Sequence, residues 1–370
     1  MRIRRNETTA ALLFLAPFLL TLAVFFIYAT VRAVYFSFTD YDLFNAPQWV
    51  GWRNYRDLFR DENFLTALRN SLVFAFVVTL VQTTGALIMA AVLNQRIRGL
   101  SFFRTAFYMP SVTSSVVITL IFLWLYQRRG AFNYLATQFQ SYLPQILAFL
   151  AVVVVAQAIQ VLWERSRGLP AKALDPALLV VSLLVGVVLV WVATATGYLS
   201  PREVADVDFV WLQTRQEIPS GAPFWLRAPV PLVAIMIQNV FTTIPTFMLM
   251  FLAALQDVPK SYYEAASLDG ATPAQQFVYI TVPSVRPVTF LVVTLGLIGT
   301  LQMFDQVAIF GDAAPLRSVI TLAYFVYNRM FPGAQLPEVG FASAAAMFLA
   351  ALTLVIVMLQ RLFLRAEGNR

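Results

Sequence analysis

Long apolar runs, most of them about one membrane thickness in length, alternate with short polar segments along this chain. A bilayer core of about 30 Å requires roughly 20 mostly apolar residues per helix. Stretches of that length occur at 10–36, 67–93, 105–126, 145–163, 177–198, 230–255, 287–310 and 340–360, the fourth being the shortest. The pattern therefore predicts an all-α fold, a polytopic membrane helix bundle with about eight transmembrane helices.

The first apolar run has the basic flank of a secretory signal, because Arg2, Arg4 and Arg5 precede it. Its apolar length exceeds the roughly 7–15 residues of a signal core, and no persuasive small-x-small cleavage site follows. We therefore expect an uncleaved first span.

An even number of spans puts the N and C termini on one side of the membrane. Basic residues are denser in the short segments of that side, for example at Arg96, Arg98 and Arg104. The positive-inside rule then predicts cytoplasmic termini and a cytoplasmic location for residues 256–285.

Composition narrows the possible chemistry. The chain is 59% hydrophobic and 12% charged, and it contains neither cysteine nor histidine. Disulfides and thiol catalysis are excluded, and the commonest general base and metal ligand are missing. No acid–base dyad, nucleophile–base pair or metal cluster is apparent, so we expect no catalytic residue, no metal site and no cofactor.

Two further features bear on partners. The only lysines, Lys172 and Lys260, lie outside any G-x-x-x-x-G-K-[ST] run, so the chain carries no P-loop of its own. The net charge of +7 is compatible with nucleic-acid binding in a soluble protein. Here the basic residues flank apolar spans, which favours orientation in membrane lipid over a nucleic-acid partner.

The polar segment 256–285 carries start and stop signals for two short helices. Ser261 and Glu264 have the spacing of a capping box, and Gly270 suits the left-handed position that ends a helix. Thr272 and Gln275 have the spacing of a second capping box, around a first-turn proline. Local chemistry alone also allows a purely structural interpretation, in which Glu264 only caps a helix and Gly270 only ends it.

Pro283 marks the expected end of the second helix. Neither helix has a long apolar face. We therefore predict a helical hairpin at the membrane surface that presents itself to a partner.

The spacing E-A-A-x-x-x-G, nine residues, then I-x-apolar-P resembles the EAA loop of ABC importer permeases. Val282 stands where that family usually carries leucine. The residues that the resemblance assigns to coupling with an ATPase are Glu264, Ala265, Ala266, Asp269, Gly270, Ile280 and Pro283.

Further segments resemble the binding-protein-dependent sugar permeases of the maltose and glycerol-phosphate type. They are 13–20, 37–44, 49–74, 98–112, 264–288, 295–307 and 340–350, so that the resemblance runs nearly from end to end. It implies one permease domain over residues 1–370, with a six-helix core and cytoplasmic coupling helices at 256–285.

The resemblance also implies partners and a location. In the family, the coupling helices dock in a cleft of an ATPase subunit, and closure of the ATPase pair drives the spans between inward- and outward-facing states. The expected partners are two ATPase subunits that bind ATP-Mg, a second homologous permease and an extracytoplasmic solute-binding protein. The expected location is the bacterial or archaeal plasma (inner) membrane.

The chain departs from the family pattern in two places. Residues 141–220 form an insertion with two extra spans, whose role is lipid-facing packing or contact with an accessory chain. The sequence GDAAPLRS at 311–318 stands where the family commonly has a Gly-Gly-Pro outer turn, which bears on contact with the binding protein.

Polar and small residues within two spans are candidates for a substrate site. Polar side chains in spans usually face the bundle interior, and maltodextrin-type relatives line their sugar site at the corresponding stretches, with an asparagine at the place of Asn239. Close helix packing is the alternative for such residues. The candidates are Asn239, Thr242, Thr243, Gly296, Gly299 and Thr300, whereas Asp305 near the end of its span is expected to be interfacial.

The sequence therefore predicts an ATP-driven importer permease, most simply for a sugar or oligosaccharide. Glycerol phosphate or a polyol is an alternative cargo. A self-sufficient secondary transporter or channel predicts internal repeats or paired intramembrane charges, and the sequence has neither. A membrane enzyme would need clustered reactive groups.

Overall fold

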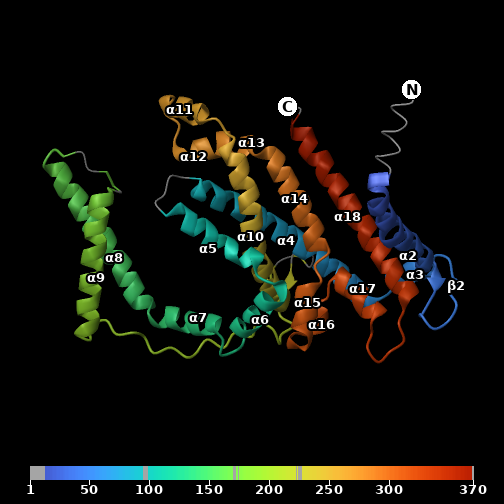
Figure 1. Ribbon diagram of the computed structural model, residues 1–370. Coiled ribbons are helices and arrows are strands. Elements are labelled where there is room, and N and C mark those ends of the chain that lie inside the picture. Colours follow the sequence, from blue (N-terminus) through green and yellow to red (C-terminus); the bar gives the residue numbers. More distant parts are fainter. Residues whose placement is uncertain are drawn as a thin grey trace, which may run out of the picture. The chain divides into compact units, whose positions relative to one another are not determined.

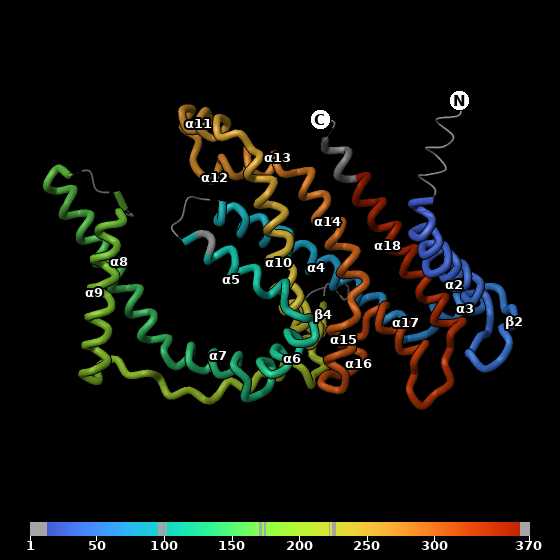
Figure 2. Tube along the Cα trace, in the orientation of Figure 1, coloured from blue at the N-terminus to red at the C-terminus, as the bar shows by residue number. Residues whose placement is uncertain are grey.

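The computed structural model describes residues 13–94, 99–169, 172–173, 175–221, 223 and 227–368. The chain forms two compact units, one made of Met1–Leu123 with Leu212–Arg370 and the other of Trp124–Trp211 (Figures 1 and 2). Arg2, Arg4 and Arg5 and the predicted start of the first span lie outside the described residues.

Helices dominate both units. The first contains the π-helix η1 (Leu22–Tyr28), α2 (Ala29–Ser37), α3 (Arg53–Leu58), α4 (Glu62–Leu93), α5 (Leu100–Val112), α6 (Ser115–Leu125, which ends at the unit boundary), α10 (Val230–Gln256), α11 (Lys260–Leu268), α12 (Pro273–Gln276), the π-helix η3 (Phe277–Thr281), α13 (Val282–Ser284), α14 (Arg286–Leu301), α15 (Asp305–Phe310), the 3₁₀-helix η4 (Gly311–Ala313), α16 (Leu316–Val319), α17 (Leu322–Met330) and α18 (Val339–Gly368). The second contains α7 (Ala131–Ser141), α8 (Leu143–Ser166) and α9 (Pro176–Ala195).

Two short antiparallel ladders accompany the helices. Strand β1 (Thr39–Asp40) pairs with β2 (Gln48–Trp49), and β3 (Glu217–Ile218) pairs with β4 (Ala228–Pro229). Both lie beside helix ends, where they close connections between spans.

Seven helical segments of the described part of the chain are long and apolar enough to cross a membrane. They are Leu13–Ser37, Glu62–Leu93, Leu143–Ser166, Pro176–Ala195, Val230–Gln256, Arg286–Ala313 and Val339–Leu362. The predicted all-α membrane bundle is therefore confirmed, and the shortest predicted span becomes a full helix, α8.

The apolar run predicted as a span at 105–126 is broken near its middle. It consists of two helices, Phe102–Val112 and Ser115–Leu125, that meet at 95°. Pro110 lies in the last turn of α5 and donates no backbone hydrogen bond, and Thr113 takes an extended conformation. The Ser111 and Thr113 hydroxyls bond to the carbonyls of Tyr108 and Met109, which satisfies polar groups at the break.

Helix α4 is the centre of the first unit, because it packs against both α10 and α14. Its first turn is capped by Asp61, whose carboxylate accepts from the backbone N–H groups of Asn63 and Phe64 at 2.8 and 3.0 Å. An apolar cluster fills the space between the second half of α4, the second half of α10 and the beginning of α14. Its members are Ala86, Ala90, Leu93, Phe247, Met248, Phe251, Leu252, Leu255, Val285 and Val292.

The directions of the first and last spans show that three parts of the first unit lie at the same end. Helix α18 runs antiparallel to α14, since the Gln360 side chain donates to the Phe290 carbonyl near the start of α14. The first span runs antiparallel to α18, since the Gly340 N–H donates to the Tyr41 carbonyl at 2.9 Å. The described start of the first span, the later part of α18 and helices α11–α13 therefore lie at the same end (Figure 1).

The second unit is held by its own polar contacts. Ser182 on α9 donates to Gln157 Oε1 on α8 at 2.8 Å, and Gly186 lets α9 approach Phe149. The amide of Asn133 bonds to the backbone near α7 and to the Phe209 carbonyl. The unit Trp124–Trp211 begins before and ends before the 141–220 insertion expected from the sequence, and it contains both of the helices expected there.

Candidate functional site

Helices α11–α13, residues 260–284, form a hairpin that we call the EAA hairpin. It begins differently from the prediction: α11 starts at Lys260, with the extended Pro259 as its N-cap and no side-chain cap. The predicted Ser261–Glu264 capping box is therefore wrong, because Ser261 already lies within the first helical turn. Glu264 is left exposed, without a hydrogen bond or ion pair to the described residues.

The turn between the two arms is as predicted. Gly270 has φ of +80°, a conformation that side chains disfavour. Its N–H donates to the Ser267 carbonyl at 3.1 Å, and the Ala271 N–H donates to the Ala266 carbonyl at 2.9 Å. This pair of bonds is a Schellman motif, which ends α11 sharply.

The second predicted capping box is confirmed. Gln275 N–H donates to Thr272 Oγ1 at 3.3 Å, and Thr272 N–H donates to Gln275 Oε1 at 2.7 Å. Two further bonds join the arms: Gln276 Nε2 to Ser267 Oγ at 2.8 Å, and the Tyr263 and Thr281 hydroxyls at 3.0 Å. The hairpin is thus fixed by its own side chains.

Pro283 lies next to the end of the second arm, as predicted, because α13 ends at Ser284. The chain stays helical to Ser284 because it widens into the π-helix η3 just before the proline, where the Val282 N–H donates to the Phe277 carbonyl. A wider turn accommodates a residue that lacks an N–H and whose ring displaces the preceding carbonyl.

The exposed face of the hairpin combines small, acidic and large apolar residues. Glu264, Ala265, Asp269 and Gly270 are exposed, whereas Ala266, Ile280 and Pro283 are half-buried. Sequence reasoning missed Leu268, which is 89% exposed beside the turn, and Tyr279, which is 76% exposed. Their signal was available: each is a large apolar or aromatic residue in a segment without an apolar core face.

A second polar site lies in the middle of the spans, around Gln82 of α4. Thr243 Oγ1 donates to Gln82 Oε1 at 2.7 Å, so that a predicted residue of α10 meets a residue that the prediction missed. Gln82 is only 1% exposed.

The predicted stripe on α14 divides between two faces. Gly296 and Thr300 face α4, where Thr300 Oγ1 lies 3.3 Å from Thr79 Oγ1. A Cβ on Gly296 would lie 2.5 Å from Gln82 Nε2, whereas one on Gly299 would have no heavy atom within 4 Å. Gly296 and Thr300 therefore face α4 beside Gln82, and Gly299 is exposed elsewhere.

The remaining predicted residues lie on α10. Thr242 bonds to the carbonyl of Asn239 at 2.9 Å, an intrahelical contact. Asn239 is buried, and its Oδ1 has no hydrogen-bond partner among the described residues. The adjacent Gln238, also missed by prediction, donates from Nε2 to Thr119 Oγ1 on α6 at 2.5 Å. Asn239 is thus the predicted residue with unused hydrogen-bonding capacity.

Asp305, expected to be interfacial, bonds to a residue of a neighbouring helix. The Ser115 hydroxyl donates to its Oδ2. Ser115 begins α6 and Asp305 begins α15, so this bond joins the break in the α5–α6 pair to the break after α14.

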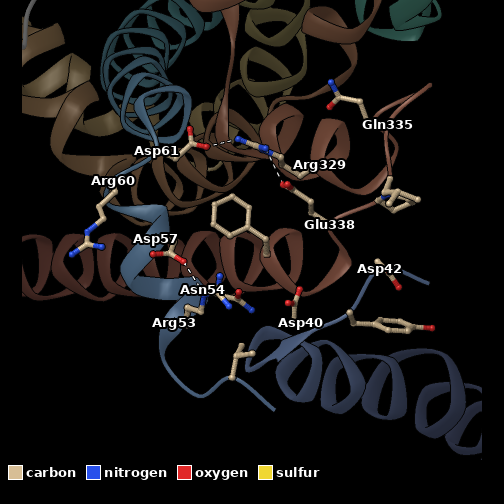
Figure 3. Close-up of a pocket in the computed structure, with 15 residues that line it drawn as sticks. Asp40, Asp42, Arg53, Asn54, Asp57, Arg60, Asp61, Arg329, Gln335 and Glu338 are labelled. Atoms are coloured by element: carbon tan, nitrogen blue, oxygen red, sulfur yellow. Dashed lines mark hydrogen bonds and ion pairs between the residues drawn. The ribbon is translucent and has the colours of Figure 1, made fainter. Parts of the chain in front are cut away.

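A charged cavity of about 870 Å³ lies beside the starts of α4 and α18, at the end of the first unit opposite the EAA hairpin. Figure 3 shows the side chains that line it. Arg329 bridges Asp61 and Glu338, the latter at 2.8 Å, and so joins the starts of α4 and α18. The pKa of the neighbouring Asp42 lies below its ordinary value, mainly because the Asn45 backbone N–H donates to its carboxylate. The charged lining residues are Asp40, Asp42, Asp57, Asp61, Glu338, Arg53, Arg60 and Arg329.

The unusual segment 311–318 lies at the same end. It forms η4 and the start of α16, and Arg317 pairs with Glu62 at 3.0 Å. Within the described ranges, no three His, Cys, Asp or Glu side chains are arranged to hold a metal ion.

Comparison with known proteins gives consistent matches. The family described as "Binding-protein-dependent transport system inner membrane component" matches residues 82–367. The lactose transport system permease protein LacF of Rhizobium radiobacter is 26% identical over 362 residues, which cover 97% of this chain and 95% of the relative. The sn-glycerol-3-phosphate transport system permease protein UgpA of Escherichia coli is 25% identical, over 96% of this chain and 94% of the relative.

A solved structure shares the fold. It is that of a bacterial ABC transporter involved in the import of the acidic polysaccharide alginate, with a TM-score of 0.66 and 17% identity. The match covers 99% of both chains.

The turn of the EAA hairpin yields a prediction. Gly270→Val should loosen the hairpin, because a β-branched side chain in the left-handed region costs about 1–2 kcal/mol. Hydrogen exchange of the amides at 265–271 should accelerate about five- to thirtyfold. Gly270→Asn is the matched control, since asparagine tolerates this conformation, and its exchange should change much less. Equal exchange in both variants would contradict the assignment of strain to this position.

Proposed function

The chain belongs to the family of binding-protein-dependent transport system inner membrane components, and we propose that it forms half of the translocation pathway of an ATP-driven sugar or oligosaccharide importer. As an ABC transporter permease it is a multi-pass inner membrane protein, and it is not the catalytic component. This assignment replaces the alternative of a self-sufficient secondary transporter or channel.

The observation that carries the coupling proposal is the EAA hairpin itself. Its two arms are tied by the Gln276–Ser267 and Tyr263–Thr281 bonds, yet Glu264 and Leu268 on its surface have no partner in the described chain. A stiff element with an exposed apolar and acidic surface is suited to transmit force to a docked protein. We assign this surface to the cleft of an ATPase subunit.

The orientation follows from the same proposal. The hairpin shares one end of the first unit with the described start of the first span and the later part of α18. If the hairpin meets an ATPase, that end is cytoplasmic, and so are both termini. The charged cavity around Arg329 then faces the extracytoplasmic side, where the binding protein docks.

The stoichiometry follows from the single hairpin. One EAA hairpin engages one ATPase subunit, so two ATPase subunits, each with ATP-Mg, require a second homologous permease.

Helices α8 and α9 are bonded to each other and otherwise expose large apolar residues, which supports contact with membrane lipid.

The polar groups near the middle of the first unit support a neutral cargo. Asn239, Thr242 and Thr243 offer an amide and hydroxyls, and the neighbouring Gln82 and Thr300 are also uncharged. Sugar hydroxyls are recognised by such groups, whereas glycerol phosphate favours a cation. A polyol remains chemically equivalent to a sugar here, and the relatives carry both sugars and glycerol phosphate.

Glu264→Lys should uncouple transport. Reversing a charge at a docked interface costs about 2–5 kcal/mol, so ATPase co-purification should weaken about thirtyfold or more. Glu203→Lys, an exposed substitution with the same charge change, is the control. Both variants should insert into the membrane. Normal co-purification and transport with Glu264→Lys would refute the proposed coupling role.

Asn239→Ala should reduce the substrate response of the assembled importer. Loss of one hydrogen bond in a buried site predicts about a three- to tenfold weaker stimulation of ATP hydrolysis. Binding protein loaded with lactose, a maltodextrin or glycerol 3-phosphate identifies the effective ligand. Thr353→Ala, which removes a buried hydroxyl from α18, is the control. An unchanged response in Asn239→Ala would remove this residue from the site.

A further inference from the structure

Gln82 contacts two helices other than its own. Its Oε1 accepts from Thr243 on α10 at 2.7 Å. Its amide end lies beside Gly296 on α14, so close that a Cβ there would be 2.5 Å from Nε2. One side chain, 1% exposed, therefore fills the junction of α4, α10 and α14.

A second contact fixes the same junction. Thr79 lies one turn before Gln82 on α4 and meets Thr300 across the interface, with 3.3 Å between the hydroxyl oxygens. Thr300 also donates to the Gly296 carbonyl at 2.7 Å. The two contacts hold α4 against α14 at two successive turns, which specifies their register.

Filling this space with a polar side chain costs more free energy than filling it with an apolar one. Leucine would pack at such a position without a polar group to satisfy, whereas a buried amide within a membrane is costly unless bonded. Here the Gln82 Oε1 is bonded to Thr243, and the Nε2 beside Gly296 has no hydrogen-bond partner among the described residues. The advantage of the amide is register: a one-residue slip of α10 would break the bond to Thr243, and a one-residue slip of α14 would replace Gly296 by a side chain against the amide. Small residues and interhelical hydrogen bonds serve this purpose in membrane helices.

The two helices that Gln82 joins to α4 are the two that bear the EAA hairpin. Helix α10 leads into α11, and α14 follows α13. From Gln82 towards the hairpin, the space between the three helices is filled by the apolar cluster that includes Ala86, Phe251 and Val285. At 1.5 Å per residue the junction lies roughly 15–20 Å from the hairpin along the helices.

We propose that Gln82 is a positioning residue for coupling: it locks α4, α10 and α14 into one body, so that movement of the EAA hairpin reaches the polar groups in the middle of the membrane. The inference rests on the proposed function of the hairpin and extends it to a residue outside the hairpin. Gln82 acts through Thr243 and Gly296 and needs no contact with substrate.

The chain contains a matched control for this role. Gln360 on α18 also accepts from a threonine of another helix, Thr294 on α14, at 3.1 Å. It holds only one of the two helices that bear the hairpin, and α18 does not lead into it. Gln360 is half-buried and also donates from Nε2 to the Phe290 carbonyl of α14 at 3.1 Å. The two glutamines therefore share a bond from a threonine and differ in their place relative to the hairpin.

The first test compares Gln82→Leu with Gln360→Leu in the purified complex with its ATPase and partner permease. The ratio of ATP hydrolysis with substrate-loaded binding protein to hydrolysis without it is measured. Gln82→Leu should lower this ratio about three- to tenfold relative to the wild type. Gln82→Asn, which keeps an amide, should lower it less than Gln82→Leu does. Gln360→Leu should change it less than twofold. An unchanged ratio in Gln82→Leu, or an equal loss in both leucine variants, overturns the inference.

The second test needs only the purified permease. Gly296→Ala should lower the midpoint of thermal unfolding in detergent, and most of this loss should disappear when Gln82→Ala is also present, because the space is then free. Gly299→Ala gives the effect of an alanine on α14 without a clash. An equal loss from Gly296→Ala with and without Gln82→Ala overturns the geometry on which the inference stands.

The two tests separate the failure of this inference from that of the proposed function. If the wild-type complex responds to binding protein and Gln82→Leu responds equally, the importer assignment stands and Gln82 has no role in coupling. If the wild-type chain assembles with no ATPase, both proposals fail, whatever the thermal measurements give.

Discussion

Polar groups within a bilayer must find their partners inside the protein, and this constraint determines much of the structure. Where a span breaks at Thr113, hydroxyls bond the backbone carbonyls beside the break. Where three helices meet in mid-membrane, Gln82 bonds Thr243, and glycine provides the space for its amide. The few polar side chains within the spans therefore mark the places where the bundle is broken or joined.

Internal hydrogen bonds and helix packing also connect the two ends of the first unit. The EAA hairpin is stiffened by its capping box and by bonds between its arms, and α10 and α14 continue from it into the bundle. The apolar cluster fills the space between these helices from the hairpin to Gln82. Asn239 and the Asp305–Ser115 contact lie farther from the hairpin than Gln82 does. In the coupling proposed above, a force on the hairpin would pass through packed helices rather than through a flexible loop.

Sequence patterns predicted the elements whose signals are local. Seven of the eight apolar runs became long helices, and the Schellman turn at Gly270 and the capping box at Thr272 follow from residues within one turn of each other. The 95° break at Thr113 and the π-helix before Pro283 were not predicted, because both depend on how the surrounding helix accommodates a proline.

Gln82 was missed for a different reason. It is one amide within an apolar run, and its partner Thr243 is 161 residues away, so no local pattern reveals the bond. The candidate stripe on α14 shows a related limit: its helical spacing is visible in the sequence, but only the packing separates Gly296, which faces α4, from Gly299, which does not.

Docking of the EAA hairpin on an ATPase subunit is tested most directly by site-specific photocrosslinking. A benzophenone amino acid at Leu268, which is 89% exposed, is compared with one at Tyr198, which is 92% exposed outside the hairpin. The account predicts an ATPase crosslink from position 268 in the assembled importer and none from position 198. An absence of ATPase crosslinks at 268, or equal crosslinking from both positions, would contradict it.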